Sequence, residues 1–233
     1  MVTTMKAKIF ELFPSLQGEG KYIGVRQVFV RFFECHMHCV WCDTPDTIGD
    51  GRRDYKEYSL EELVAAIRPL IAGSHSVSLT GGEPLLQADF IKDFIPLFKK
   101  SGLKIYLETS GVLYKELDKI IDQVDIIAMD MKLPSSTEAR NFWREHEEFL
   151  KRARKKDLFI KTVISGQTTR DDLQKAVELV ARYDPEIIFY LQPNHFESSN
   201  GILGKCLLFQ QYCSQYLREV RVVPQIHKLM NLP

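Results

Sequence analysis

Apolar and polar residues alternate along the chain with two different periods, one typical of strands and the other of amphipathic helices. Short runs rich in β-branched and aromatic residues predict strands over residues 6–13, 27–33, 76–80, 104–108, 125–131, 158–164, 186–191 and 219–223. Stretches with helical spacing predict helices over residues 59–71, 86–100, 115–123, 136–155, 170–183 and 201–216. Ser59 followed by Glu62 is a capping-box sequence, and Gly102 stands where a helix is expected to end.

This alternation of strands and helices predicts an α/β fold with a mostly parallel sheet, because parallel neighbours need a long crossover connection. About six strand–helix units indicate a partial (β/α)6-type barrel rather than the complete barrel of eight. Periodicity does not separate that barrel from a doubly wound open sheet. In both architectures the chemistry gathers where the strands end. The sequence shows no internal repeat, low-complexity tract or linker, so residues 1–233 are expected to form one domain.

The composition is that of an ordinary globular protein, since 45% of the 233 residues are hydrophobic and 27% are charged. Lys plus Arg and Asp plus Glu each number 31, and this balance argues against binding nucleic acid through its phosphates. No apolar run is long enough to span a bilayer, and the N-terminus lacks the pattern of a signal peptide. We therefore expect a cytoplasmic protein that binds neither nucleic acid nor membrane.

Three of the five cysteines crowd together as Cys35, Cys39 and Cys42, in a loop that follows a predicted strand. Such a cluster is more typical of a metal or catalytic site than of a disulfide framework. Zinc would need a fourth ligand, which His36 or His38 could supply. A [4Fe–4S] cluster could instead take the three thiolates and leave one iron open to a substrate amine and carboxylate.

A second motif, Thr80-Gly81-Gly82-Glu83-Pro84, lies between a predicted strand and a predicted helix. Paired glycines let a backbone edge approach a ligand, with amide groups that no side chain obstructs. The carboxylate of Glu83 stands next to that edge and suits an ammonium group. A tight strand-to-helix turn is the simpler interpretation of this motif taken alone.

The two motifs together resemble the radical S-adenosylmethionine enzymes, in the CxxxCxxC spacing with Trp41 before the last cysteine and in the later GGEP. The resemblance implies that Cys35, Cys39 and Cys42 hold a [4Fe–4S] cluster. It also implies that the open iron chelates the methionine part of S-adenosylmethionine, and that Glu83 and its neighbours hold the methionine amino group.

Further segments resemble the 7-carboxy-7-deazaguanine synthases within that group: residues 13–20 (FPSLQGEG), the triplet Cys42-Asp43-Thr44, Arg31, and the ending from Gln225 to Pro233. That family converts 6-carboxy-5,6,7,8-tetrahydropterin into 7-carboxy-7-deazaguanine by a radical ring contraction that releases ammonia. The resemblance thus implies a carbon–nitrogen lyase of 7-deazapurine biosynthesis, on the route to queuosine or archaeosine.

The same resemblance assigns residues to each ligand, while the radical chemistry itself belongs to the cofactors. The pterin pocket is expected to contain Leu16, Gln17, Gly18, Glu19, Arg31, Thr80, His227 and the C-terminal Pro233. The S-adenosylmethionine site is expected to contain Gly82, Glu83, Asp130, Met131, Lys132, Ser135, Gln192, Pro193 and Asn194. Thr44 is expected to bind Mg²⁺, which prefers oxygen ligands. Residues 108–111 (ETSG) are a further strand-end candidate.

The resemblance also implies partners: an external one-electron donor of flavodoxin or ferredoxin type, and a second copy of the chain in a homodimer. Two alternatives remain at this stage. Another radical S-adenosylmethionine enzyme, such as a glycyl-radical activase, would share both motifs but has no use for the LQGEG segment. A non-catalytic zinc-binding module would need only the cysteines. Cys206 and Cys213, seven residues apart in a predicted helix, are interpreted as core residues.

Overall fold

The computed structural model describes residues 5–51, 54–197 and 201–232, and these form one sheet in the order β3-β1-β2-β4-β5-β6-β7-β8-β9. The strands are β1 (Ala7–Leu16), β2 (Arg26–Phe32), β3 (Lys56–Tyr58), β4 (Ser76–Gly81), β5 (Lys104–Thr109), β6 (Ile126–Asp130), β7 (Asp157–Ile164), β8 (Phe189–Pro193) and β9 (Val220–Val222). β2 and β4 to β9 pair in parallel, whereas β1 pairs antiparallel with both β2 and β3.

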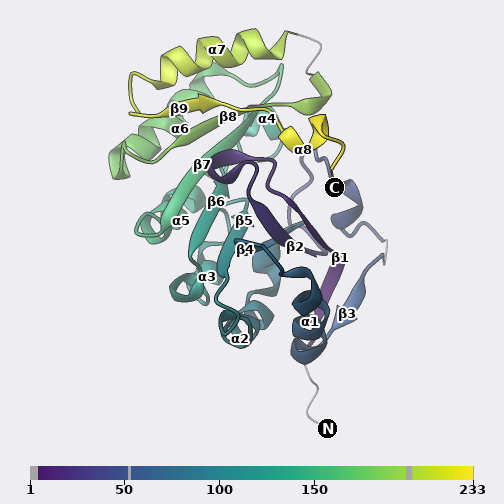
Figure 1. Ribbon diagram of the computed structural model, residues 1–233. Helices are drawn as coiled ribbons and strands as arrows, with labels where there is room; N and C mark the ends of the chain where they lie inside the picture. Colours follow the sequence, from purple (N-terminus) through teal and green to yellow (C-terminus); the bar gives the residue numbers. More distant parts are fainter. Residues whose placement is uncertain (1–4, 52–53, 198–200, 233) are drawn as a thin grey trace.

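Helices supply the crossovers: α1 (Leu60–Ile67), α2 (Ala88–Lys99), α3 (Tyr114–Leu117), α4 (Pro134–Thr137), α5 (Trp143–Ala153), α6 (Arg170–Tyr183) and α7 (Ile202–Cys213), followed by α8 (Ile226–Leu229) near the C-terminus. Figure 1 shows α2, α3 and α5 along one side of the sheet and α8 on the other side, near β1. The parallel strands follow one another in chain order, with no reversal of the kind that defines a doubly wound sheet. The predicted mostly parallel α/β fold is confirmed, and the strand order favours the partial barrel.

Local structure departs from the sequence-based prediction in three places. The predicted helix over 136–155 is two helices, because the chain turns through left-handed backbone at Glu138 (φ 57°). Phe142 is buried beyond that turn and packs with Met37 and Val112, so tertiary contact overrides helical spacing. The helix predicted over 115–123 is shorter, since α3 gives way to a 3-10 turn. The short edge strand β3 was not predicted.

The two faces of the sheet have different chemistry because alternate residues of each strand point to opposite sides. Apolar residues on the outer face pack against the helices and form the main core. On the inner face a first layer is largely aromatic, with Tyr106, Phe159 and Tyr190 packed around Ala128. Two residues further along these strands, where they approach their carboxyl ends, the inner positions are polar: Glu108, Lys161, Gln192 and Asp130.

The turn after β1 packs against the aromatic layer on the inner face of the sheet. Gly20 has a φ of 63°, and a Cβ there would lie 2.2 Å from the ring of Phe159, so only glycine fits at this contact. The polar layer is therefore left as the floor of a cavity at the carboxyl ends of the strands. In the described part of the chain, no helix is long and apolar enough to cross a membrane.

Candidate active site

A cavity of about 200 Å³ lies at the carboxyl ends of the parallel strands. Most of the residues expected to bind pterin, cluster or S-adenosylmethionine line it: Leu16, Gln17, Gly18, Glu19, Arg31, Cys35, Cys39, Cys42, Thr44, Thr80, Gly82, Asp130, Lys132, Gln192, Asn194 and His227. Four expected residues are absent from the lining, namely Glu83, Met131, Ser135 and Pro193. Pro233 lies outside the described residues. The fold therefore brings segments from most of the chain to one place.

The cysteine loop leaves β2 through strained backbone and is fixed at several points. Glu34 has a φ of 81°, which is unusual for a residue other than glycine, and its carboxylate pairs with Lys8 at 2.6 Å. The amide of Glu34 donates to the carbonyl of Thr47 at 2.8 Å, so this hydrogen bond joins the two ends of the cysteine loop. The indole of Trp41 donates to the carbonyl of Ser136 at 2.6 Å and attaches the loop to α4. The aromatic residue of the motif thus holds the loop in place.

The three thiols are free and partly buried, and they face the same cavity. Burial raises the pKa of Cys35 to about 11 and also raises the pKa of Cys39, so these thiols keep their protons near neutral pH, and a metal centre would have to displace those protons. Among the described residues the three sulfurs do not gather within 4.8 Å of one another, whereas ligands of one zinc ion lie about 3.8 Å apart. A [4Fe–4S] cluster fits a wider spacing, because each cysteine binds a different iron.

The glycines of the TGGEP segment lie directly against the backbone that leads into the cysteine loop. A Cβ on Gly81, where φ is 130°, would lie 2.2 Å from the carbonyl oxygen of Phe32. The amide of Gly82 donates to Phe32 at 3.1 Å, and that of Glu83 donates to Glu34 at 2.8 Å. The expectation of amides open to a ligand is therefore wrong for these two groups. Their role in the structure is to extend the pairing of β2 and β4 towards Cys35.

The Glu83 carboxylate points to the end of β5 rather than into the cavity. It accepts hydrogen bonds from the hydroxyl of Thr109 at 2.8 Å and from the amide and hydroxyl of Ser110 at 2.8 and 2.6 Å. Thr109 and Ser110 themselves line the cavity. Glu83 therefore positions two other residues of the lining in this structure. The backbone of Met131 is likewise paired with Lys161, while its side chain lies in the outer core.

A row of charged side chains forms the cavity floor. Lys161 of β7 pairs with Glu19 and, at 3.1 Å, with Asp130, which also pairs with Lys132 at 2.9 Å. The ammonium of Lys132 lies 4.7 Å from the ring centre of Trp41, which connects the row to the cysteine loop. Burial raises the pKa of Asp130, but Lys132 and Lys161 outweigh burial, and the pKa ends below its usual value. Asp130, Lys132 and Lys161 therefore stay charged inside the cavity.

Glu108 lies beside this row and has neutral donors as its hydrogen-bond partners. It accepts from the amide of Gln17 and from the hydroxyl of Thr80, both at 2.7 Å. Burial, together with the nearby Glu19 carboxylate, raises the pKa of Glu108. Gln17 and Thr80 were both expected at the pterin, so Glu108 orients two residues of that subsite.

The C-terminal segment closes the cavity on the side of Glu19. The amide of Ile226 donates to the carbonyl of Gly18 at 2.9 Å, and a Cβ on Gly18 would lie 2.2 Å from the ring of His227. The side-chain amide of Gln225 donates to Glu19 at 2.7 Å and to Asp43 at 3.0 Å. One glutamine therefore joins the N-terminal loop, the cysteine loop and the C-terminal segment.

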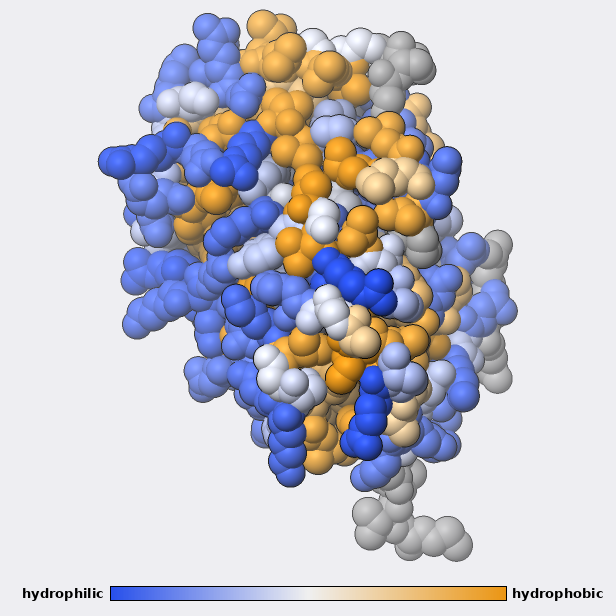
Figure 2. Space-filling view, in the orientation of Figure 1, coloured by the Kyte–Doolittle hydropathy of each residue, from blue (hydrophilic) through white to orange (hydrophobic). Residues whose placement is uncertain are grey.

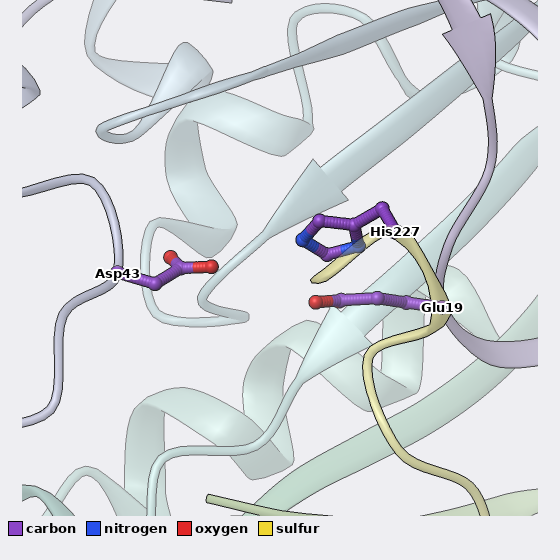
Figure 3. Close-up of side chains that lie close together, drawn as sticks. All are labelled: Glu19, Asp43 and His227. Atoms are coloured by element: carbon purple, nitrogen blue, oxygen red, sulfur yellow. The ribbon is translucent and has the colours of Figure 1, made fainter. Parts of the chain in front are cut away.

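Glu19, Asp43 and His227 face one another in Figure 3, and one ligand atom of each lies within 4.8 Å of the others. The two carboxylates already have Lys161 and Lys228 as cationic neighbours. A metal ion would have to compete with both ammonium groups. We therefore interpret Glu19, Asp43 and His227 as a polar edge of the cavity that recognises a ligand through hydrogen bonds.

Sequence reasoning missed Lys161, Asp43 and Gln225 as separate site residues. Lys161 carried a visible signal, because it is the one charged residue in the apolar run Leu158–Ile164. Asp43 and Gln225 lay within segments already singled out, but nothing in the sequence showed that they would meet.

A buried histidine holds the backbone behind the cavity. His146 of α5 is fully buried, its Nδ1 donates to the carbonyl of Gly111 at 3.0 Å, and its Nε2 accepts from the amide of Lys132 at 3.2 Å. Burial lowers the pKa of His146 from 6.5 to about 4.

This histidine predicts a pH dependence of stability. The unfolded chain takes up the proton near pH 6.5, whereas the folded protein resists protonation down to about pH 4. The free energy of unfolding should fall by about 3 kcal/mol over this interval because of His146 alone. Urea unfolding of wild type and His146→Gln at several pH values measures it. Parallel pH curves for the two proteins would contradict the prediction.

The fold and the cysteine site together define a class of enzyme. The family model of the radical SAM superfamily matches residues 30–180. The structure is similar to QueE from Escherichia coli, with a TM-score of 0.66 over 96% of this chain and 95% of that one at 23% identity, which shows a shared fold. It is also similar to TYW1 with a lysine–pyruvate adduct, with a TM-score of 0.57 over 83% of this chain and 74% of that one at 15% identity. Membership of the superfamily implies a [4Fe–4S] cluster and S-adenosylmethionine.

Sequence relatives narrow the class further. The chain is 37% identical to the 7-carboxy-7-deazaguanine synthase of Geobacter sulfurreducens, with 97% of each covered. It is 34% identical to that of Thermoplasma acidophilum, over 95% of this chain and 96% of the relative. The chain belongs to the 7-carboxy-7-deazaguanine synthase family of radical SAM enzymes. The predicted family and enzyme activity are thereby confirmed, and the activase and zinc-module alternatives are set aside.

Proposed function

We propose that the enzyme converts 6-carboxy-5,6,7,8-tetrahydropterin into 7-carboxy-7-deazaguanine and ammonia inside the cavity described above. The observation that carries this proposal is the meeting of the three cysteines with Gln17, Glu19 and Arg31 in one cavity. A pterin needs donors and acceptors along one edge and a cation for its carboxylate. The cavity offers both kinds of group within reach of the cysteine loop.

Arg31 is the cation that suits the pterin carboxylate. Its guanidinium lies over the ring of Phe13, 5.3 Å from the ring centre, and pairs with Glu11 at 2.9 Å. These two contacts fix the orientation of the planar guanidinium group against the ring of Phe13. A guanidinium held in this way favours a bidentate contact with a carboxylate. Glu19, with the imidazole of His227 nearby, suits the N–H groups of the pterin ring. The terminal carboxylate of Pro233 is proposed to complete this subsite.

Cofactor sites follow from the remaining lining residues. Cys35, Cys39 and Cys42 would hold the cluster, and the lining residues Gly82, Asp130, Lys132, Gln192 and Asn194 would contact S-adenosylmethionine. When bound and reduced, these cofactors would supply the radical chemistry at the substrate. The protein orients the pterin, excludes water and keeps the charged row in place. We also propose that the S-adenosylmethionine site includes four residues outside the cavity lining, namely Glu83, Met131, Ser135 and Pro193.

Thr44 is proposed as a ligand of Mg²⁺, because it lines the cavity and follows Asp43 directly. A hard cation there would neutralise part of the substrate carboxylate and supplement Arg31.

Partners and context are also proposals. A flavodoxin or ferredoxin would deliver the electron, and the cysteine loop offers an exposed side for it at Val40, which is 60% exposed.

A homodimer is supported by the exposed leucines of α7, Leu203, Leu207 and Leu208, where Figure 2 shows an apolar patch. Five free thiols fit the reducing cytoplasm. We further propose that residues 1–233 act as one domain in 7-deazapurine biosynthesis, towards queuosine or archaeosine.

The test is anaerobic incubation of the reconstituted enzyme with reductant, S-adenosylmethionine and the carboxytetrahydropterin, followed by mass spectrometry. Formation of carboxydeazaguanine supports the proposal, and its absence from cluster-loaded enzyme contradicts it. Arg31→Met should raise KM for the pterin by roughly 10- to 150-fold, the equivalent of about 1.5–3 kcal/mol for a hydrogen bond to a charged group. Arg26→Met, at the exposed start of the same strand, is the control and should leave KM unchanged.

A further inference from the structure

Lys161 is the central cation of the charged row on the cavity floor. We propose that Lys161 is a positioning residue that holds the pterin-facing carboxylate of Glu19 and the nucleoside-facing carboxylate of Asp130 with one ammonium group. The binding of the two ligands is thereby coupled. This inference rests on the proposed function, which places the pterin at Glu19 and S-adenosylmethionine at Asp130.

The geometry gives one ammonium group two carboxylates from different parts of the fold. Lys161 lies in the middle of β7, Asp130 ends the neighbouring strand β6, and Glu19 comes from the loop after β1. Lys161 pairs with Glu19 and lies 3.1 Å from Asp130. The exposed fractions of the three side chains are 12%, 14% and 11%, so water screens these pairs only weakly.

Asp130 keeps an acceptor for a ligand. Its Oδ2 receives both Lys161 and Lys132, whereas its Oδ1 is buried and has no hydrogen-bond partner in the described part of the protein. Asp130 also lines the cavity. A buried carboxylate oxygen without a partner is costly, so this atom is poised for a hydroxyl or N–H group of a bound ligand.

Removing Lys161 leaves the row with an excess of negative charge, and Glu108 beside the row also faces this ammonium group. Glu19 and Asp130 carry two negative charges, and Lys161 and Lys132 carry two positive charges. The other donors to Glu19 in the described structure are the neutral amides of Gln192 and Gln225. Burial lowers the pKa of Lys161, but Asp130 and Glu19 outweigh it and the pKa ends well above its usual value, so the ammonium stays charged.

Coupling follows because the two carboxylates share this cation. A pterin that donates hydrogen bonds to Glu19 changes how strongly Glu19 holds Lys161, and thus the charge that Asp130 presents to S-adenosylmethionine. Linkage is reciprocal, so each ligand must change the affinity of the other by the same factor. We expect S-adenosylmethionine to change the affinity for the pterin by at least about fivefold, within the usual range of such couplings.

The test measures binding without turnover. Cluster-loaded enzyme, kept anaerobic and without reductant, is titrated with carboxytetrahydropterin and with S-adenosylmethionine, each alone and with the other saturating. Lys161→Met should weaken both ligands by about tenfold, because it leaves an unpaired buried carboxylate, and should bring the coupling factor to about one. Lys161→Arg should recover part of both affinities. Lys21→Met, which removes a lysine paired with Asp157 at the start of the same strand, is the matched control.

The inference would be overturned if Lys161→Met bound both ligands within twofold of wild type. It would also be overturned if the variant lost affinity for one ligand while the coupling stayed intact. If Lys161→Met does not fold, the double variant with Glu19→Gln restores the charge balance. S-adenosylmethionine binding to that double variant is then compared with Glu19→Gln alone. A loss of about threefold or more supports the role of Lys161, and equal affinity overturns it. Failure of the proposed function is distinct, because then wild type makes no carboxydeazaguanine.

Discussion

Replacing Cys39 with alanine should abolish turnover and most of the bound iron. Its thiol is one of three that face the cavity, and with only two protein ligands the cluster has no fixed open iron. Because the radical chemistry depends on the cofactors, activity should fall by at least about three orders of magnitude. Iron and sulfide analysis after anaerobic reconstitution, together with the assay for carboxydeazaguanine, measures both effects.

Cys206→Ala is the matched control for this loss. Cys206 is buried in α7 within the outer core, and burial raises its pKa to about 11, so it behaves as a small apolar residue. This variant should keep its iron and its activity, with a modest loss of stability. A Cys39→Ala enzyme that retains a full cluster and normal turnover would contradict the assignment of the cysteine site.

Substituting Gly81 with alanine should damage the site through the backbone. The new Cβ would lie 2.2 Å from the carbonyl oxygen of Phe32, and alanine is strained at a φ of 130°. Because Phe32 leads into the cysteine loop, the clash should displace Cys35 as well as lower stability. We expect a loss of about 3 kcal/mol in the free energy of unfolding, and reduced cluster content.

Gly102→Ala separates strain from collision. Gly102 has a φ of 80° just after α2, and nothing lies within 4 Å of a Cβ built there. Its substitution should cost only about 1 kcal/mol and leave the iron content unchanged. Equal losses of stability and of iron in the two variants would show that contact with Phe32 has no special importance. Urea unfolding and iron analysis give both measurements.

The sequence was sufficient for most of the sheet because buried parallel strands are short apolar runs between helices. It was insufficient for β3, whose residues Lys56, Glu57 and Tyr58 have no apolar run and pair at the sheet edge with β1. The helix predicted over 136–155 failed for a related reason. Its break at Glu138 is set by packing of Phe142 behind the cysteine loop, which no local pattern reveals.

For the site, local motifs identified the residues but not their partners. The cysteines and Arg31 were found from their segments, and both line the cavity. The present partners of Glu83 were not evident from its segment, because its carboxylate turns to Thr109 and Ser110 at the end of β5. Its contact with the methionine amino group stays a prediction. Contacts of this kind depend on which strands become neighbours. That order follows from the whole fold rather than from any one segment.

The bridge made by Gln225 has a consequence for how the enzyme is made in the cell. It joins Glu19 to a residue 206 positions later, so the cavity has one open wall until the segment around α8 has been synthesised and has folded against Glu19. The cysteines leave the ribosome long before that moment. A cluster inserted after the segment around Gln225 has folded would be enclosed on this side, whereas one inserted earlier would meet solvent and oxygen there.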